Sequence, residues 1–216
     1  MTAGSGQRTA DGERRALPRL VLIADGFTSE AVQRQVLEAV QAGRLWLHLR
    51  DHAASDEAFA QAAHALAAQV RAVRPGTLVS VNTRTEVARP LGVGLHVGTR
   101  GPSVAEARRR HPGALLSYAA HTPSEARAAA EQGADAVLFS PIFPTTSKPG
   151  HLGIGLEALA ACCAAVPDTP VFALGGITPA RAASCLSAGA YGVAVLSGIL
   201  RAPDPAAATA LYLDAL

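Results

Sequence analysis

The segment PVFALGGITPARAASCLSAGAYGVAVLSGI, residues 170–199, contains two short apolar runs that are each followed by small residues and a turn into a helix-like stretch. The first run ends at two glycines, after which Thr178 and Pro179 begin the helical stretch. Threonine followed by proline is a typical helix start, because the hydroxyl caps free N–H groups and proline fits the first turn. The second run ends in a similar turn at Ser197. The segment therefore predicts consecutive units of strand, turn and helix.

The same alternation of apolar runs and alanine-rich stretches extends upstream to residue 20. The runs are LVLIA at 20, LWLHLR at 45, TLVSVN at 77, VGLHVG at 93, ALLSYAAH at 114, DAVLFS at 135, PVFALGG at 170 and YGVAVLS at 191. Their mean spacing of roughly 24 residues is short but sufficient for a closed barrel. We predict an α/β fold, a single-domain (β/α)8 TIM barrel over residues 18–216, after a flexible tail at residues 1–17. An open doubly wound sheet is the alternative, although no G-x-G-x-x-G motif follows the first run.

The composition excludes several classes of function. The chain of 216 residues is 49% hydrophobic and 17% charged, and its formal net charge of +2 is too balanced for a nucleic-acid groove or a polybasic membrane anchor. No segment has the pattern of a signal peptide or a membrane span. Cys162, Cys163 and Cys185 lack the spacing of zinc ligands or redox motifs. We expect a cytoplasmic protein that binds neither nucleic acid nor membranes.

Strand periodicity predicts which side chains enter the barrel. In LWLHLR the residues Trp46, His48 and Arg50 share one face, and this face points inward because an arginine packs poorly under helices. By the same parity, Asn82 and His121 point inward at the ends of their strands. Polar side chains thus collect at the C-terminal mouth of the barrel, where barrel enzymes place their active sites.

Two adjacent turns predict a phosphate site. Gly175 and Gly176 follow the seventh run, and Leu196, Ser197 and Gly198 follow the eighth. Small residues there let an anion reach backbone N–H groups at a helix N-terminus, which is how barrels commonly bind phosphate. The alternative is that the glycines only permit tight turns.

A long loop, residues 139–155, follows the sixth run in a chain whose other connections are short. Long loops in compact domains are usually functional. The loop contains Lys148, the only lysine among the 19 basic residues. A lysine where arginine is otherwise used indicates a need for a compact ammonium group, with a chance surface lysine as the alternative. We expect Thr145, Ser147 and Lys148 to contact the substrate.

The seven histidines differ in their expected roles. His121 ends the fifth run immediately before a helix, so it can exchange protons with a bound ligand near neutral pH. His48 lies deeper in the barrel and is placed to orient a neighbour. The others discussed are expected to be structural or neutral: His96 in the barrel wall, His64 and His111 as exposed helix or helix-end residues, and His151 in the loop.

Seven blocks in the correct order resemble the thiamine phosphate synthase superfamily of barrels over nearly all of residues 19–200. The blocks are HLRD at 48–51, VNTR at 81–84, GLHVG at 94–98, AAHTPSEA at 119–126, GADAVLFSPIFPTTSK at 133–148, ALGGITP at 173–179 and GVAVLSGI at 192–199. The superfamily contains two activities, the synthase and a thiazole tautomerase. Departures from the synthase pattern favour one of them.

The synthase pattern implies Mg²⁺ held by carboxylates. It has an Asp directly after the third strand and another in the turn after the fourth, where this chain has Thr83 and a turn at residues 98–102 without a carboxylate. A lysine of the synthase, two residues beyond the arginine of the second strand, is here His52. Because Mg²⁺ prefers carboxylate oxygens, the similarity to the synthase is weakest at its metal site. Asp25 and Asp51, near strand ends, leave metal recruitment open.

The chain is more similar to the tautomerase branch, which lacks these carboxylates and has His-x-Arg on the second strand, as at His48 and Arg50. This resemblance implies metal-free aromatisation of a carboxythiazole phosphate tautomer in thiamine biosynthesis, without a cofactor. It assigns proton transfer to His121 and includes Asn82 among the substrate contacts. Arg50 or Lys148 is expected to hold the substrate carboxylate, with Arg50 the first choice.

Two other functions stay open from the sequence. One is a Mg²⁺-dependent thiamine phosphate synthase. The other is a non-catalytic barrel that binds a thiazole or thiamine phosphate and regulates a partner, because a binding site and a catalytic site can share one phosphate cradle. An alanine-rich barrel is also compatible with a homodimer.

Overall fold

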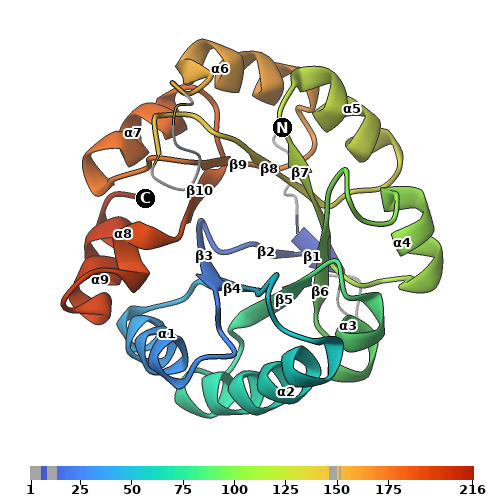
Figure 1. Ribbon diagram of the computed structural model, residues 1–216. Helices are drawn as coiled ribbons and strands as arrows, with labels where there is room; N and C mark the ends of the chain where they lie inside the picture. Colours follow the sequence, from blue (N-terminus) through green and yellow to red (C-terminus); the bar gives the residue numbers. More distant parts are fainter. Residues whose placement is uncertain (1–5, 9–13, 146–149, 151) are drawn as a thin grey trace.

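Eight parallel strands form a closed barrel in the computed structural model, in the order β10-β3-β4-β5-β6-β7-β8-β9. The structure describes residues 6–8, 14–145, 150 and 152–216. Helices surround the barrel as an outer ring (Figure 1). The prediction of a single-domain (β/α)8 TIM barrel is therefore confirmed, and the open doubly wound sheet is excluded because β10 pairs with β3 and leaves no sheet edge.

Every apolar run that we predicted to be a strand is a strand of the barrel. The strands are β3 (Leu20–Asp25), β4 (Trp46–Arg50), β5 (Leu78–Asn82), β6 (Gly94–Val97), β7 (Leu116–Ala120), β8 (Ala136–Phe139), β9 (Val171–Leu174) and β10 (Gly192–Val195). Each pairs in parallel with the next along the chain, for example with Leu47 of β4 opposite Val79 of β5. All strand ends that carry the predicted site therefore meet at one rim.

The helices follow the strands as predicted, with one addition. They are α1 (Glu30–Ala42), α2 (Asp56–Val73), α3 (Thr85–Leu91), α4 (Val104–Arg110), α5 (Pro123–Glu131), α6 (Gly155–Ala165), α7 (Pro179–Ser187), α8 (Ser197–Leu200) and α9 (Pro205–Asp214). α8 begins at Ser197, where we predicted a turn into a helix, but it is short, and the second helix of the eighth unit, α9, was not predicted separately. Within the described part of the chain, no helix combines the length and the apolar character needed to cross a membrane.

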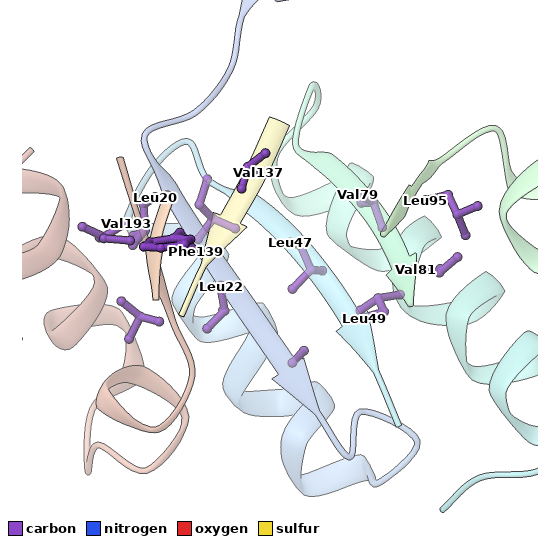
Figure 2. Close-up of a cluster of buried hydrophobic side chains, with 14 of the residues drawn as sticks. Leu20, Leu22, Leu47, Leu49, Val79, Val81, Leu95, Val137, Phe139 and Val193 are labelled. Carbon is purple, nitrogen blue, oxygen red and sulfur yellow. The ribbon is translucent and has the colours of Figure 1, made fainter. Parts of the chain in front are cut away.

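The alternation of strand side chains divides the core into two layers. Leu47 and Leu49 belong to a large buried cluster between the strands and the helices (Figure 2). Trp46, on the opposite face of β4, belongs to a smaller cluster inside the barrel. There its ring meets Phe172 of β9 edge to face, with ring centres 5.6 Å apart. The predicted inward face of β4 is therefore confirmed.

Part of the predicted N-terminal tail is described. β1 (Gly6–Arg8) and β2 (Arg14–Ala16) pair as an antiparallel two-stranded sheet. Leu17 is buried in the cluster inside the barrel, and its carbonyl accepts a hydrogen bond of 2.6 Å from the Tyr191 hydroxyl. Leu17 thus covers the N-terminal end of the barrel. The rest of the tail lies outside the described residues, and its flexibility stays a prediction.

Two of the histidines expected to be neutral or structural lie on helices. His64 is exposed on α2, as predicted. His111 follows the last residue of α4 but is only 6% exposed, so the expectation of an exposed residue was wrong. His111 lies beside α3, since it interacts with the Thr85 backbone and with the charges of Glu86 and Arg89, and burial lowers the pKa of this histidine. His151 lies outside the described residues.

Replacing Leu22 with alanine tests the layer between strands and helices. Leu22 is fully buried there, so we expect the free energy of unfolding to fall by about 2–5 kcal/mol. Leu211→Ala is the control, because Leu211 is 60% exposed and its loss should change stability by no more than about 0.5 kcal/mol. Urea unfolding followed by circular dichroism measures both variants. Equal losses would contradict this assignment of the core.

Candidate active site

A cavity of about 310 Å³ lies at the C-terminal ends of the barrel strands. Its lining includes most residues that we predicted to bind or convert a substrate: His48, Arg50, Asn82, His121, Thr145, Gly175, Gly176, Leu196, Ser197 and Gly198. Ser147 and Lys148 lie outside the described residues. The volume suits a small ligand. The structure thus brings the predicted residues to one place, and their roles in binding stay predictions.

His121 presents a basic nitrogen at this cavity. It follows the last residue of β7, is exposed, and lines the cavity. Its Nδ1 lies 2.7 Å from the carbonyl oxygen of Ser140. Because a carbonyl can only accept a hydrogen bond, Nδ1 carries the proton, and the neutral ring has its lone pair on Nε2. This is the tautomer that a general base requires.

The start of α5 fixes the backbone at His121. The Glu125 carboxylate accepts a hydrogen bond of 2.7 Å from the backbone N–H of His121. The Thr122 hydroxyl in turn accepts one of 3.2 Å from the backbone N–H of Glu125, in an arrangement close to a capping box. Glu125 was not among the predicted site residues, although the Thr-x-x-Glu spacing at the helix start is visible in the sequence.

His48 and His96 form the floor of the cavity inside the barrel. Their rings meet edge to face with centres 4.7 Å apart. The Nδ1 of His48 lies 3.0 Å from the hydroxyl of Ser80, and the Nδ1 of His96 lies 2.8 Å from that of Ser117. The Trp46 indole N–H also donates to Ser80, at 2.8 Å. The floor is thus a buried polar layer whose ring orientations are set by hydrogen bonds.

Both floor histidines are neutral near neutral pH. Burial, followed by the charges of His96 and Arg50, lowers the pKa of His48 well below its ordinary value. Burial and Arg50 lower the pKa of His96 from 6.5 to about 4. Among the described residues, no buried side-chain nitrogen lacks a hydrogen-bond partner, and only Nδ1 of each ring has one. The Nε2 atoms must therefore reach the cavity surface, so His96 is the hydrogen-bonded wall residue that we expected and also part of the cavity lining.

The acidic residues near the mouth are already engaged. Arg50 donates from Nε to Oδ1 of Asp25 at 2.9 Å. Burial raises the pKa of Asp51, but hydrogen bonds from the Thr28 hydroxyl and from backbone N–H groups outweigh it and hold the pKa below its usual range. Neither Asp25 nor Asp51 belongs to the cavity lining.

The lining does not fit a magnesium site. The described residues around the cavity include no Asp or Glu, and no three or more His, Cys, Asp or Glu gather as metal ligands in the described ranges. At the two segments where the synthase pattern has carboxylates, Thr83 packs against Gly101, so that a Cβ on Gly101 would lie 3.0 Å from Cγ2 of Thr83. A threonine hydroxyl and a glycine offer Mg²⁺ no charged oxygen ligand.

The turns after β9 and β10 offer backbone donors to an anion. The N–H groups of Gly176, Ser197 and Gly198 donate to no described residue. Glycine is required at two of these positions by close packing, because a Cβ on Gly176 would lie 2.4 Å from the Pro144 carbonyl oxygen and one on Gly198 would lie 2.2 Å from the Tyr212 hydroxyl. The glycines therefore permit tight turns and at the same time leave backbone N–H groups available to donate hydrogen bonds to a phosphate.

The cysteines lie away from the cavity. None of them lines it, and all three are free thiols. Burial raises the pKa of the Cys162 thiol to about 12 and that of the Cys185 thiol to about 11. Such thiols are protonated near neutral pH and make poor nucleophiles.

Sequence reasoning missed Arg100. It is exposed in the turn after β6 and lines the cavity. We considered that turn only for its missing carboxylate. Its position directly after a barrel strand was the signal that could have identified it, since residues there reach the mouth.

Comparison with known proteins gives one family. Residues 20–199 match the family model described as thiamine monophosphate synthase. The chain is 38% identical over 194 residues to the thiamine-phosphate synthase of Chloroflexus aurantiacus, covering 88% of each. It is 40% identical over 192 residues to the thiamine biosynthesis bifunctional protein ThiM/ThiE of Symbiobacterium thermophilum, covering 87% of this chain but only 39% of that protein. The solved structure of thiamine phosphate pyrophosphorylase from Pyrococcus furiosus superposes with a TM-score of 0.81 at 26% identity, covering 91% of this chain and 94% of that one.

Acid is expected to destabilise the fold through His96. The pKa of this residue is about 4 in the fold against 6.5 for an ordinary histidine, so between these values the unfolded chain binds one more proton. Stability should be complete above the upper value and fall through this window by about 1.4 kcal/mol per pH unit for one proton. His48 adds a loss in the same direction.

Urea unfolding at a series of pH values measures this slope. His96→Gln should reduce the slope by the share of one proton, because the substituted side chain does not titrate while His48 still does. His64→Gln is the control, since His64 is exposed and its replacement should leave the slope unchanged. An unaltered slope in the His96 variant would show that another group causes the loss.

Proposed function

This chain belongs to the thiamine monophosphate synthase family, and we propose that within the family it is a thiazole tautomerase. The reaction is the metal-free aromatisation of a carboxythiazole phosphate tautomer in thiamine biosynthesis. One observation carries the proposal: the cavity is lined by His121, whose Nδ1 is engaged by the Ser140 carbonyl, and by no carboxylate among its described residues. This combination suits proton transfer without a metal ion.

His121 is the proposed acid and base. Its Nε2 removes the proton from ring C2 of the substrate, and the electron pair of that bond enters the ring. The electron pair of the exocyclic double bond then takes up a proton from the same imidazolium, which forms a new C–H bond at the side-chain carbon outside the ring. No atom is gained or lost, as an isomerisation requires. The Ser140 carbonyl keeps Nδ1 protonated throughout and stabilises the imidazolium that forms between the two steps.

The remaining lining residues are proposed to hold the substrate. The phosphate accepts hydrogen bonds from the backbone N–H groups of Gly176, Ser197 and Gly198. The neutral floor formed by His48 and His96 offers uncharged ring nitrogens beneath the thiazole. Because burial lowers the pKa of both floor histidines, the proposal leaves proton transfer to His121 at the rim.

The synthase activity is the second candidate, and the names of the relatives favour it. The matching proteins of Chloroflexus aurantiacus and Pyrococcus furiosus carry synthase or pyrophosphorylase names. That reaction uses Mg²⁺ to carry a pyrophosphate. The cavity of this chain lacks acidic ligands among its described residues, and this supports the tautomerase over the synthase.

Turnover in the presence of EDTA is the test of the proposed function. The purified protein is mixed with the dihydrothiazole carboxylate phosphate in EDTA, and aromatisation is followed by ultraviolet absorbance. We expect a rate well above the spontaneous one, because every group in the mechanism belongs to the chain. Loss of the rate on chelation would contradict a metal-free reaction.

A parallel assay separates the alternatives. With the pyrimidine pyrophosphate and the thiazole phosphate, a synthase would form thiamine phosphate only when Mg²⁺ is added. Ligand binding in a calorimeter with turnover in neither assay would instead identify a non-catalytic binding protein.

The His121→Asn variant tests the assignment of the proton-transfer residue. Asparagine keeps a polar group of similar reach but cannot exchange a proton near neutral pH. We expect kcat to fall by about 10²–10⁴, with a much smaller change in substrate affinity. His64→Asn, on the exposed face of α2, is the matched control and should react normally. A normal kcat in His121→Asn would remove this residue from the mechanism.

A further inference from the structure

The charged residues at the cavity are all basic in the described part of its lining. They are Arg50 and Arg100, accompanied by four histidines, His48, His52, His96 and His121. Two of the histidines are neutral through burial. Because no acidic residue opposes these cations in the described lining, the mouth favours a ligand with negative charge at more than one point.

The two arginines differ in what they can offer such a ligand. Arg50 is 27% exposed and its Nε is bonded to Asp25 at 2.9 Å, so part of its charge is already compensated. Arg100 is exposed and forms no hydrogen bond or ion pair with any described residue. Arg100 is therefore the uncompensated cation among the described residues of the lining. An incoming carboxylate would not have to displace another anion from it.

The backbone that carries Arg100 is held in place. The turn closes through a hydrogen bond of 2.9 Å from the Gly101 N–H to the Gly98 carbonyl. Gly101 packs tightly against Thr83, a β-branched residue at a φ of 54°, where such residues are rare. The Thr83 N–H is bonded to the carbonyl of His96 at 2.8 Å. Strained backbone that persists at a ligand site commonly serves to position a group.

Barrel topology places Arg100 across the mouth from the phosphate donors. β6 and β10 are separated by four steps in either direction around the eight-stranded ring, so they lie on opposite sides (Figure 1). Arg100 follows β6, and Ser197 and Gly198 follow β10. His121 follows β7, the neighbour of β6. A ligand whose phosphate binds in the turn after β10 therefore extends across the mouth toward Arg100. The end of the ligand opposite the phosphate lies close to the His121 imidazole, because β7 is next to β6.

We propose that Arg100 binds the carboxylate of the substrate and makes the site selective for carboxylated thiazole phosphates. This inference rests on the proposed function. It replaces Arg50, our first choice from the sequence, because Arg50 is paired with Asp25. Arginine suits the role, since its planar guanidinium can bind a carboxylate through two parallel hydrogen bonds. The carboxylate on ring C2 is thereby held beside the proton that His121 removes.

Calorimetric titration with two probes tests the proposal. The probes are the aromatic carboxythiazole phosphate and the same thiazole phosphate without the carboxylate. We expect the unaltered protein to bind the carboxylated probe more tightly by about 10-fold to 100-fold, the range for a charge-assisted hydrogen bond. Arg100→Ala should lose this preference while binding the second probe with unchanged affinity. Arg109→Ala, which removes an exposed arginine from α4 outside the lining, should keep the preference.

The possible results separate this inference from the function on which it rests. A preference that survives in Arg100→Ala, or one that is lost only in Arg50→Ala, overturns the role of Arg100. An equal loss of affinity for both probes overturns it as well, since that result indicates general damage to the site. If the preference depends on Arg100 but the tautomer assay shows no turnover, the binding role stands and the catalytic proposal fails. An unaltered protein that binds neither probe overturns both.

Discussion

The parallel pairing of β10 with β3 closes the sheet, and the geometry of the mouth depends on this closure. In a closed ring each strand has an inside, so alternate residues must enter the barrel or face the helices. Closure also brings the turns after all eight strands to a single rim. The donors after β10, the imidazole after β7 and the arginine after β6 thus face one cavity, although they are far apart in sequence.

Periodicity was sufficient to predict what depends on closure and alternation. The barrel strands, the inward face of Trp46, His48 and Arg50, and the position of His121 at the mouth all follow from the apolar runs and their parity. Contacts between side chains of different strand-helix units were not predictable from periodicity. The pairing of Arg50 with Asp25 and the burial of His111 depend on distances that only the assembled barrel defines.

The role of Arg100 and the contact between His96 and His48 also depend on how separate strands are arranged in the barrel. The position of Arg100 after an apolar run could place it at the mouth, but its place across from the donors after β10 follows only from the strand order of the closed barrel. His96 could be placed in the barrel wall from its strand, but its contact with His48 requires the register between β4, β5 and β6. Ser147 and Lys148 cannot be compared in this way, because they lie outside the described residues.

Burial and exposure divide the electrostatics of the cavity into two zones. At the floor, desolvation keeps His48 and His96 uncharged, so hydrogen bonds to Ser80 and Ser117 can hold them without counter-ions. At the rim, Arg100 is exposed. The described lining thus combines an uncharged floor with a basic rim, and none of its described residues presents a charged oxygen to a metal cation.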